Sequence, residues 1–549
     1  MTGHPPVSLL AFCCKGWRPY FCIALAGSLV YLRTLFFGYT YLDDNALVLD
    51  NQIFLRHLSN IIPAFGVDVF HVLHSATVYY RPLLTISFIL DAQWGGASPG
   101  AYHLTNLLIH LCASCLIYRF LTALAYGPEE GLFWSLAFTV HPVLSQAVAW
   151  IPGRNDSLLA IFVLAAFISL VGFLRTRKMR LLLGHLSCFA LGLLTKESAA
   201  CVVPLGLCYW ASAVEGRGRI RNGMVLLSGW GLVLALWFFL RQSALQNPIH
   251  MTMTDMARAV WHNSPAVIPL AGKIFFPLDL SVMPVLRDMS FLYGFAAIGG
   301  LSAALWASSK KSWPRVLFGL SWFFLFLWPS FIRPNPAIAA EFLEHRLYLP
   351  IVGIIILLCE TSWLKDRVVS SQRGADLAGL ILAALALGAF NHSRNFQDRQ
   401  SFWSNAVETS PHSPLAHRNL GAMYYLGGQP SLAEPEYRKA LELNPLEPMA
   451  HNNLGLIYMA QGLLPEAEQE FLRELAINPS YDKAFLNLGD LRYRQGRGGD
   501  AAVLWIKALE SNPVCSEACR NLADYYKKNK DIAPAQAYVA SCLLPSLGH

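Results

Sequence analysis

The sequence predicts an all-α protein that consists of a polytopic membrane domain followed by a helical solenoid. Hydrophobic residues make up 54% of the chain and charged residues only 14%, and the mean hydropathy is +0.39. These values are too apolar for a soluble protein of this length. The end of the chain is more polar and repeats itself every 34 residues. We therefore expect a membrane domain at 1–392 and a solenoid at 393–549.

Apolar runs of about 20 residues, the length that crosses a bilayer, divide the first domain. We expect about eleven such spans, near residues 18–39, 101–123, 131–150, 156–174, 180–195, 197–214, 223–240, 290–307, 314–332, 347–363 and 375–391. The first span has a basic start at Lys15 and Arg18. It is too long for the hydrophobic part of a signal peptide and has no clear small-residue cleavage site, so we expect it to be retained.

Basic clusters predict the orientation of the spans. They follow even-numbered spans and comprise Arg175, Arg177, Lys178, Arg180, Arg217, Arg219, Arg221, Lys310, Lys311, Arg315, Lys365, Arg367 and Arg373. Only the loop near Glu129 and Glu130 is a weak member of this set. Because basic loops stay in the cytoplasm, we expect the long loops 40–100, 241–289 and 333–346 on the extracytoplasmic face. An odd number of spans places residues 392–549 on that face as well.

The solenoid is predicted from residues that recur in register. Asn-Leu-Gly at 419–421, 453–455 and 487–489 is followed by Asn-Leu-Ala at 521–523, and alanines recur at Ala433, Ala467, Ala501 and Ala535. This is the tetratricopeptide (TPR) period, in which small residues sit where two helices touch and aromatic residues fill the gaps. The predicted units are a half repeat at 397–411 and repeats near 415–448, 449–482, 483–516 and 517–546. In the last unit Cys519 is expected to pack in the core, or to form a disulfide with Cys542.

The strongest candidate site is the pair Asp43 and Asp44, directly after the first span. Two adjacent carboxylates at a membrane boundary repel each other and lose hydration, so one of them is suited to act as a general base. The alternative is a helix cap or an interfacial pair.

Further ionisable residues fall at the same edge of other spans. They are Arg81 in Tyr-Arg-Pro-Leu, His141 before a proline, Arg154 and Asp156 in Gly-Arg-Asn-Asp, Lys196 with Glu197, and Glu344, His345, Arg346 and Tyr348 in Glu-His-Arg-Leu-Tyr-Leu-Pro. Charges at membrane depth are costly and commonly functional. Structural ion pairs remain an alternative for Lys196 with Glu197 and for Glu344 with Arg346, and aromatic residues such as Tyr348 suit the interfacial belt.

Taken in this order along essentially the whole chain, these motifs resemble the TMTC family of transmembrane and TPR-containing protein O-mannosyltransferases. The resemblance implies a GT-C fold and the transfer of a sugar, with inversion, from a polyprenyl-phosphate donor to an acceptor. Two features depart from the family. The array is shorter than in animal members, and Gln146 stands where an acid is expected. They indicate a bacterial relative in the inner membrane with a periplasmic TPR domain; a eukaryotic protein would place that domain in the ER lumen.

Each candidate receives an expected role. Asp43 is the preferred base, and Asp44 would orient the acceptor or a metal. Arg346, Arg81, Arg154 and Lys196 are the candidates for binding the donor phosphate, because guanidinium and ammonium groups suit phosphate oxygens. The supporting residues are Glu344, Glu197, His141, Asp156, His345 and Tyr348. We expect no cofactor beyond the polyprenyl-phosphate sugar, although two vicinal aspartates are also compatible with a divalent ion.

The function we favour is the transfer of a mannose-like sugar to a Ser or Thr hydroxyl of a protein that the TPR array binds. One alternative is a GT-C-like transferase or ligase acting on lipid or polysaccharide, and the other is a non-enzymatic TPR membrane scaffold. The net charge of +7 comes from small basic clusters between apolar segments, and no nucleic-acid-binding module is recognisable. We therefore expect no nucleic-acid partner.

Overall fold

The computed structural model describes residues 13–73, 78–213, 219–245, 251–332, 340–361, 372–513 and 515–529. Within these ranges the chain is helical and contains no strand, only an isolated antiparallel bridge between Val285 and Glu341. This confirms the predicted all-α class. The chain divides into two compact units, residues 1–409 and 410–549, which we call the membrane unit and the TPR unit.

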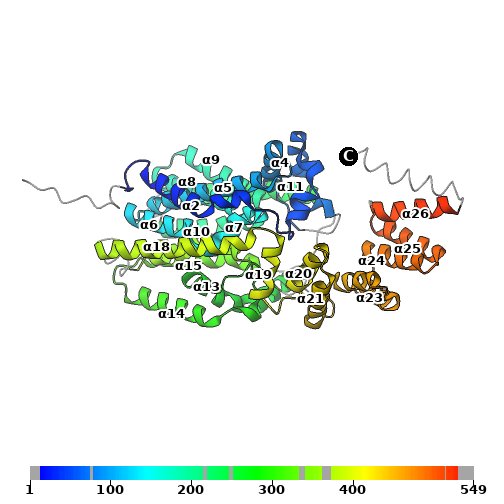
Figure 1. Cartoon of the computed structure of the whole chain (residues 1–549). Coiled ribbons are helices and arrows are strands. Elements are labelled where there is room, and N and C mark those ends of the chain that lie inside the picture. Colours follow the sequence, from blue (N-terminus) through cyan, green and yellow to red (C-terminus); the bar gives the residue numbers. More distant parts are fainter. Residues whose placement is uncertain are drawn as a thin grey trace, which may run out of the picture. The chain divides into compact units, whose positions relative to one another are not determined.

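The membrane unit is a bundle of long helices joined by short helical turns (Figure 1). Its α-helices are α2 (Arg18–Tyr31), α3 (Gln52–Leu55), α4 (Pro82–Gly95), α5 (Pro99–Ala123), α6 (Pro128–Thr139), α7 (Ser145–Ala149), α8 (Arg154–Thr176), α9 (Met179–Thr195), α10 (Val202–Ala213), α11 (Arg219–Ala244), α12 (Met253–Asn263), α13 (Val267–Phe275), α14 (Phe291–Ala307), α15 (Trp313–Leu327), α16 (Pro350–Cys359), α18 (Gln372–Ser393) and α19 (Arg399–Thr409). Short turns that bear on the site are η1 (Leu32–Phe36), η2 (Asn45–Leu49), η8 (Glu197–Cys201), η12 (Glu344–Leu347) and η13 (Arg394–Phe396).

Helices long and apolar enough to cross a membrane are fewer than the spans expected from the sequence. Among the described residues six helices meet this condition, and a seventh is added if the bent pair Pro128–Thr139 and Pro142–Ala149 is one span. The helices at the other four predicted positions, α9, α10, α14 and α16, are only 10 to 17 residues long. The protein is thus a multi-pass membrane protein, and the count of eleven stays a prediction.

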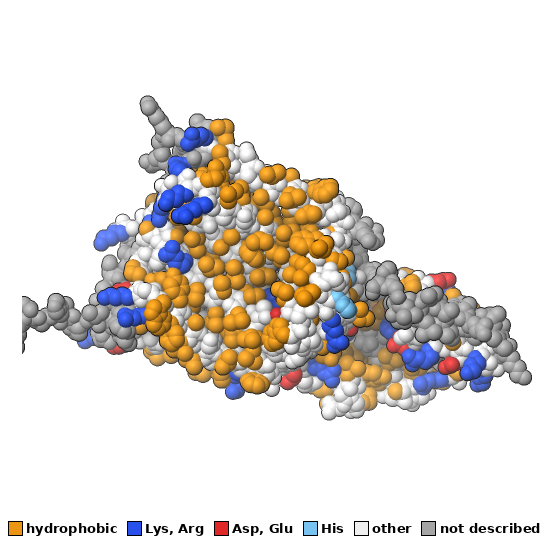
Figure 2. Space-filling model, turned by 90° about the horizontal axis from the view of Figure 1, so that it is seen from above, with side chains coloured by type: hydrophobic (Ala, Val, Ile, Leu, Met, Phe, Trp, Pro, Cys, Tyr) orange, Lys and Arg blue, Asp and Glu red, His pale blue; other side chains and the backbone are white. Residues whose placement is uncertain are grey.

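The surface of the membrane unit suits a lipid environment. Large hydrophobic side chains such as Leu29 of α2, Leu232 of α11 and Leu292 of α14 are more than 70% exposed, and Figure 2 shows a broad hydrophobic face. Many of the basic side chains in that view lie along its left margin. The linker between α8 and α9 also exposes two basic side chains, Arg177 and Lys178.

Glycines allow close helix contacts inside the membrane unit. A Cβ on Gly319 of α15 would lie 2.9 Å from the carbonyl oxygen of Gly353 in α16, and a Cβ on Gly272 of α13 would lie 2.6 Å from the amide nitrogen of Gly294 in α14. Small residues let backbones approach each other in this way in membrane proteins. These contacts join helices that are neighbours along the chain, and the two pairs do not share one spacing.

The TPR unit is built from helical hairpins whose helices are α20 (Pro414–Leu426), α21 (Pro430–Leu443), α22 (Ala450–Ala460), α23 (Leu464–Ile477), α24 (Asp482–Arg494), α25 (Gly498–Ser511) and α26 (Ser516–Lys528). In each of three hairpins a glycine faces an aromatic ring: Gly421 with Tyr437, Gly455 with Phe471 and Gly489 with Trp505. A second glycine after each first helix has positive φ, namely Gly428, Gly462 and Gly496. Because both glycine positions recur at the same spacing, the 34-residue period follows from packing and turn geometry.

The repeat boundaries stay predictions, with two structural qualifications. The predicted half repeat at 397–411 contains α19, which belongs to the membrane unit by its contacts. The second helix expected in the last repeat, with Ala535 and Cys542, lies outside the described residues. Cys519 is disulfide-bonded.

Candidate active site

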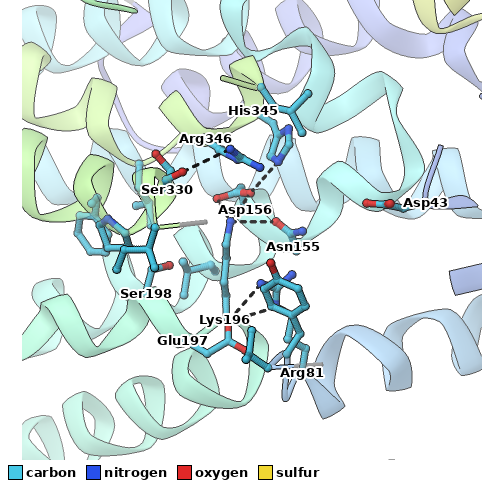
Figure 3. A pocket seen from close by; sticks show the side chains of 18 of the residues that line it. Asp43, Arg81, Asn155, Asp156, Lys196, Glu197, Ser198, Ser330, His345 and Arg346 are labelled. Carbon is cyan, nitrogen blue, oxygen red and sulfur yellow. Dashed lines mark hydrogen bonds and ion pairs between the residues drawn. The ribbon is translucent and has the colours of Figure 1, made fainter. Parts of the chain in front are cut away.

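A cavity of ≈ 590 Å³ lies in the membrane unit and collects most of the candidate residues. It is lined by Asp43, Arg81, Asp156, Lys196, Glu197, His345 and Arg346, among other residues. They come from five places: the loop after α2, the start of α4, the first turn of α8, the junction of α9 with η8, and η12. The structure therefore brings together seven side chains that the sequence separates by up to three hundred residues (Figure 3).

The Asp43 carboxylate stands apart from the other charges of the cavity in Figure 3. Its side chain is partly buried, and within the described residues no group donates a hydrogen bond to it. Burial raises the pKa of Asp43 to about 6, with Arg81 lowering it, Glu341 raising it and Arg346 lowering it. A carboxylate of this kind is largely ionised at neutral pH, yet it is a stronger base than an ordinary aspartate.

Asp44 has a different place from Asp43. Its side chain is 1% exposed, and its Oδ2 accepts hydrogen bonds from the backbone amides of Thr40 (2.7 Å) and Tyr41 (3.1 Å) and from the Thr40 hydroxyl (2.5 Å). Tyr41 has a φ of 60°, a conformation that non-glycine residues keep only when their surroundings hold it. Asp44 thus shapes the turn that presents Asp43, and it does not line the cavity.

Two cations of the cavity are held by carboxylates. Lys196 Nζ is 2.7 Å from both carboxylate oxygens of Asp156, and Arg81 Nη2 is 3.2 Å from Glu197 Oε2. Lys196 follows the last residue of α9 in an extended conformation, and Arg81 precedes the proline that begins α4. Helix ends therefore direct both side chains into the cavity.

The η12 turn supplies the third cation and a histidine. Arg346 Nη1 donates to the carbonyl oxygens of Glu341 (2.9 Å) and Ser330 (3.4 Å). The His345 ring is tilted against Trp150, with its Nε2 3.6 Å from Asp156 Oδ2. Burial lowers the pKa of His345 well below 6.5, and the neighbouring cations lower it further, so its imidazole is neutral at physiological pH.

Besides Asp44, four predicted residues lie outside the cavity. Arg154 is fully buried, with its guanidinium 2.6 Å from Asp91 Oδ2 and 2.6 Å from the Asn106 side-chain oxygen. The structure therefore does not present Arg154 to a donor phosphate, because its guanidinium is enclosed by partners that link α4, α5 and α8. His141 forms a hydrogen bond with the carbonyl oxygen of Ile274, and the Tyr348 hydroxyl forms one with the His110 ring.

Glu344 is the fourth such residue and is fully buried. Its oxygens contact Lys273 Nζ (2.9 Å), the amide of Ser281 (2.8 Å) and His392 Nε2 (3.1 Å). Burial raises the pKa of Glu344, but Lys273 and these hydrogen bonds outweigh it and lower the pKa below its usual value. Glu344 thus anchors η12 to α13 and α18, and it does not pair with Arg346.

Several lining residues were not predicted as site residues, notably Asn155, Ser198, Arg241, Ser330 and Glu341. Asn155 and Glu341 lie within three residues of predicted site residues. Like those residues, they are polar side chains at the edge of an apolar segment, and this pattern could have identified them. Arg241 ends a predicted span and donates to the carbonyl of Val78 (3.1 Å). Ser198 and Ser330 carry no signal in the sequence that distinguishes them from other serines.

The arrangement combines three features that a group transfer to a hydroxyl requires. A base of raised pKa shares a cavity with several cations, and Phe326, Leu349 and Pro350 form an apolar wall. In the described part of the chain no group of three His, Cys, Asp or Glu residues could hold a metal ion. The cavity can therefore bind an anion beside an apolar surface and take a proton from a hydroxyl held near Asp43.

The chain is similar to known families in both units. Residues 93–240 match the family of dolichyl-phosphate-mannose-protein mannosyltransferases, and residues 427–482 and 486–539 match a tetratricopeptide repeat family. The solved structures that it resembles include the crystal structure of MamA, at 20% identity and a TM-score of 0.24 over 29% of this chain and 88% of that one.

Relatives of the chain are named protein O-mannosyl-transferases. Protein O-mannosyl-transferase Tmtc1 of Drosophila melanogaster is 30% identical over 210 residues, which is 37% of this chain and 24% of the relative. Human protein O-mannosyl-transferase TMTC4 is 25% identical over 414 residues, which is 62% of this chain and 55% of the relative. The matches thus span between about a quarter and about half of these relatives. The chain thus combines a region similar to the mannosyltransferase family with TPR repeats, and it is similar to TMTC protein O-mannosyl-transferases over part of their length.

Proposed function

We propose that the protein transfers a mannose-like sugar from a polyprenyl-phosphate donor to a Ser or Thr hydroxyl of a protein acceptor. The observation that carries this proposal is the Asp43 carboxylate, which shares a cavity with Arg81, Lys196 and Arg346. The mannosyltransferase family match and the names of the relatives supply the sugar and the donor class.

In the proposed reaction Asp43 accepts the proton of the acceptor hydroxyl. The hydroxyl oxygen forms a bond to the anomeric carbon from the face opposite the leaving phosphate, so the configuration inverts. The bond between the anomeric carbon and the phosphate oxygen breaks, and its electron pair leaves with the polyprenyl phosphate. A base with a pKa of about 6 is deprotonated at neutral pH and strong enough to assist this step.

The three cations would stabilise the charge on the leaving phosphate. Arg346 and Arg81 present planar N–H groups that match phosphate oxygens, and Lys196 supplies a point charge. Asp156 and Glu197 hold Lys196 and Arg81 at contact distance, so these cations are positioned before the donor binds. Pre-positioned charge acts on the transition state without reorganisation.

We propose that the cavity opens on the extracytoplasmic face. Asp43 follows α2, Lys196 follows α9 and Asp156 lies in the first turn of α8, whereas the basic linker between α8 and α9 lies at the other end of these two helices. Basic linkers stay in the cytoplasm. The disulfide at Cys519 supports the same assignment for the TPR unit, because disulfides persist in oxidising compartments.

Two other functions remain as candidates. A transferase or ligase that acts on lipid or polysaccharide would use the same base and the same cations, and differs only in the acceptor. A non-enzymatic scaffold has no need of a raised-pKa carboxylate opposite clustered cations, so the cavity argues against it. The TPR unit favours a protein acceptor, because TPR hairpins commonly bind extended peptide.

Transfer by the full-length protein in liposomes, with polyprenyl-phosphate mannose and Ser- or Thr-containing peptides, tests the proposal. Asp43→Asn should lower the rate by on the order of a hundredfold or more, whereas Asp50→Asn, an exposed position of the same loop, is the matched control. Full activity of Asp43→Asn would exclude this residue as the base. Comparison of the intact glycoproteome of a deletion strain with that of its parent identifies the sugar and the acceptor.

A further inference from the structure

The helix α19 resembles a TPR helix in its sequence but makes its contacts inside the membrane unit. Trp403 of α19 falls in register with Tyr437, Phe471 and Trp505 at the 34-residue period. Those three aromatic residues pack on a glycine of their own hairpin. Trp403 is fully buried, and its indole Nε1 donates to the carbonyl oxygen of Thr40 at 3.0 Å.

The segment that leads into α19 contacts the turn before Asp43 at two further points. The amide of Gly38 donates to the carbonyl of Gln397 at 2.7 Å, and the Arg399 guanidinium lies 5.1 Å from the centre of the Tyr41 ring. Tyr41 has positive φ, and such a conformation persists only where surrounding contacts fix it. The contacts from residues 397–403 therefore join Asp44 in fixing this turn.

The other end of α19 contacts the residues that support η12. Thr409 Oγ1 is 2.7 Å from Ser281 Oγ, and the Ser281 amide donates to Glu344 at 2.8 Å. In addition, the Val282 amide donates to the Asn405 side chain at 3.4 Å. The carbonyl of Val282 accepts from Gln146 (3.1 Å), whose side-chain oxygen accepts from the His345 amide (3.1 Å).

We propose that α19 is a positioning helix of the active site, with Trp403 placing the turn that carries Asp43 and Thr409 placing η12 with Arg346. This inference rests on the proposed function, since it assigns a purpose to geometry around that cavity. The physical reason is that a base acts only within hydrogen-bond reach of its proton. A displacement of about 1 Å can reduce the rate by about a hundredfold. One helix that contacts the turn before Asp43 and, through Ser281, the support of η12 limits such displacement.

Steady-state kinetics of the full-length protein test the first half of this proposal. Trp403→Phe keeps the aromatic bulk but removes the N–H donor, and Trp505→Phe is the matched control because its indole donates to Asp490 within its own hairpin at 2.9 Å. We expect Trp403→Phe to lower kcat by on the order of tenfold to a hundredfold, with the KM for the donor unchanged. The acid limb of its pH–rate profile should also move to lower pH, because a loosened turn exposes Asp43 to water. Trp505→Phe should behave as the wild type.

A second pair of variants tests the other half and guards against misfolding of the first. Thr409→Val removes the hydroxyl at constant shape and should raise the KM for the donor, whereas Thr409→Ser keeps the hydroxyl and should restore it. Wild-type kcat and pH profile in Trp403→Phe, with Asp43→Asn inactive, would overturn the positioning role and leave the proposed function standing. Full activity in Asp43→Asn would overturn both. Equal KM values in Thr409→Val and Thr409→Ser would remove the role of Thr409.

Discussion

The two units of the protein use ion pairs in opposite ways. In the membrane unit Arg154 and Asp91 are 2.6 Å apart with side chains 0% and 3% exposed, and the pair connects α8 with α4. In the TPR unit Lys439 and Glu442 are 2.9 Å apart with side chains 42% and 68% exposed, one helical turn apart. The first pair fixes distant segments of the chain in a dry interior. The second is solvated and contributes little to stability.

The packing of glycine differs between the units in the same way. In three hairpins of the TPR unit a glycine meets an aromatic residue of its own hairpin, sixteen residues away, as Gly421 meets Tyr437. In the membrane unit Gly319 meets the backbone of a different helix at Gly353. Local packing gives the solenoid a period that can be read from the sequence. The site of the membrane unit instead depends on pairs far apart in the sequence, such as Arg81 with Glu197, which cannot be paired without the structure.

The largest effect is expected from truncating the chain on either side of α19, which tests whether α19 belongs functionally to the membrane unit. A chain ending at residue 409 retains α19 and should still glycosylate a short peptide in excess while losing protein acceptors. A chain ending at residue 392 lacks α19 and should lose transfer to both acceptors, because the turn at residues 38–44 and η12 lose their support. Transfer assays with the two chains, each matched for membrane insertion, measure this difference. Equal peptide activity in both chains would show that α19 is dispensable, and equal loss of both acceptors in the longer chain would show that the repeats stabilise the membrane unit.

The second prediction compares the two kinds of ion pair directly. Arg154→Met leaves Asp91 as an unpaired charge in the interior, and should destabilise the membrane unit by about 3–5 kcal/mol. Lys439→Met should cost about 1 kcal/mol or less. Thermal unfolding midpoints in the same detergent compare the two variants. Similar shifts for both would mean that the interior around Arg154 admits water.

The fold could be predicted from the sequence further than the site could. Apolar runs and the 34-residue period are local signals. The structure therefore confirms the all-α class, and a helix lies at the position of every predicted span. The number of full-length spans could not be predicted, because α9 and α14 are short helices and because the turns η8 and η12 take up the start of the spans expected at 197–214 and 347–363. Lys196 directly precedes η8 and Arg346 lies in η12, so the turns that shorten these spans also build the site.

Charge at a span edge identified candidates for the site but not their partners. Lys196, Arg81 and Arg346 line the cavity, whereas Arg154 has the same sequence character and lies buried against Asp91. Asp91 and Lys273 are buried charges that the sequence analysis did not single out. A pairing between residues about sixty or more positions apart leaves no trace in one sequence, so exposure to the cavity had to come from the structure.

A smaller effect, on the KM for the donor, is expected from substituting Arg346, a cation of the cavity. Arg346→Ala should raise the KM for the donor by about tenfold to a hundredfold, which corresponds to about 1.5–3 kcal/mol for a charged hydrogen bond. Arg346→Lys should recover only part of this loss, because the planar guanidinium is absent. Arg258→Ala, at a side chain 76% exposed, is the control and should have no effect. Full recovery by lysine would mean that Arg346 acts only as a point charge.

The smallest effect concerns the pH dependence of a single carboxyl group. Because the pKa of Asp43 is raised to about 6, transfer should fall about tenfold per pH unit below that value, as the base becomes protonated. The raised pKa also affects the free energy of unfolding, because the folded protein holds the Asp43 proton more tightly than the unfolded chain does. The resulting stabilisation is present below about pH 4 and is lost as the pH rises through about 6. Asp43→Asn mimics the protonated form and should raise the unfolding temperature more at pH 7.5 than at pH 4.5. Asp500→Asn, at an exposed position of the solenoid, should show no such difference between the two pH values. If Asp43→Asn changes the unfolding temperature equally at both pH values, the Asp43 carboxylate is hydrated and its burial has no energetic cost. The contrast between a dry site and a solvated solenoid would then not hold for Asp43.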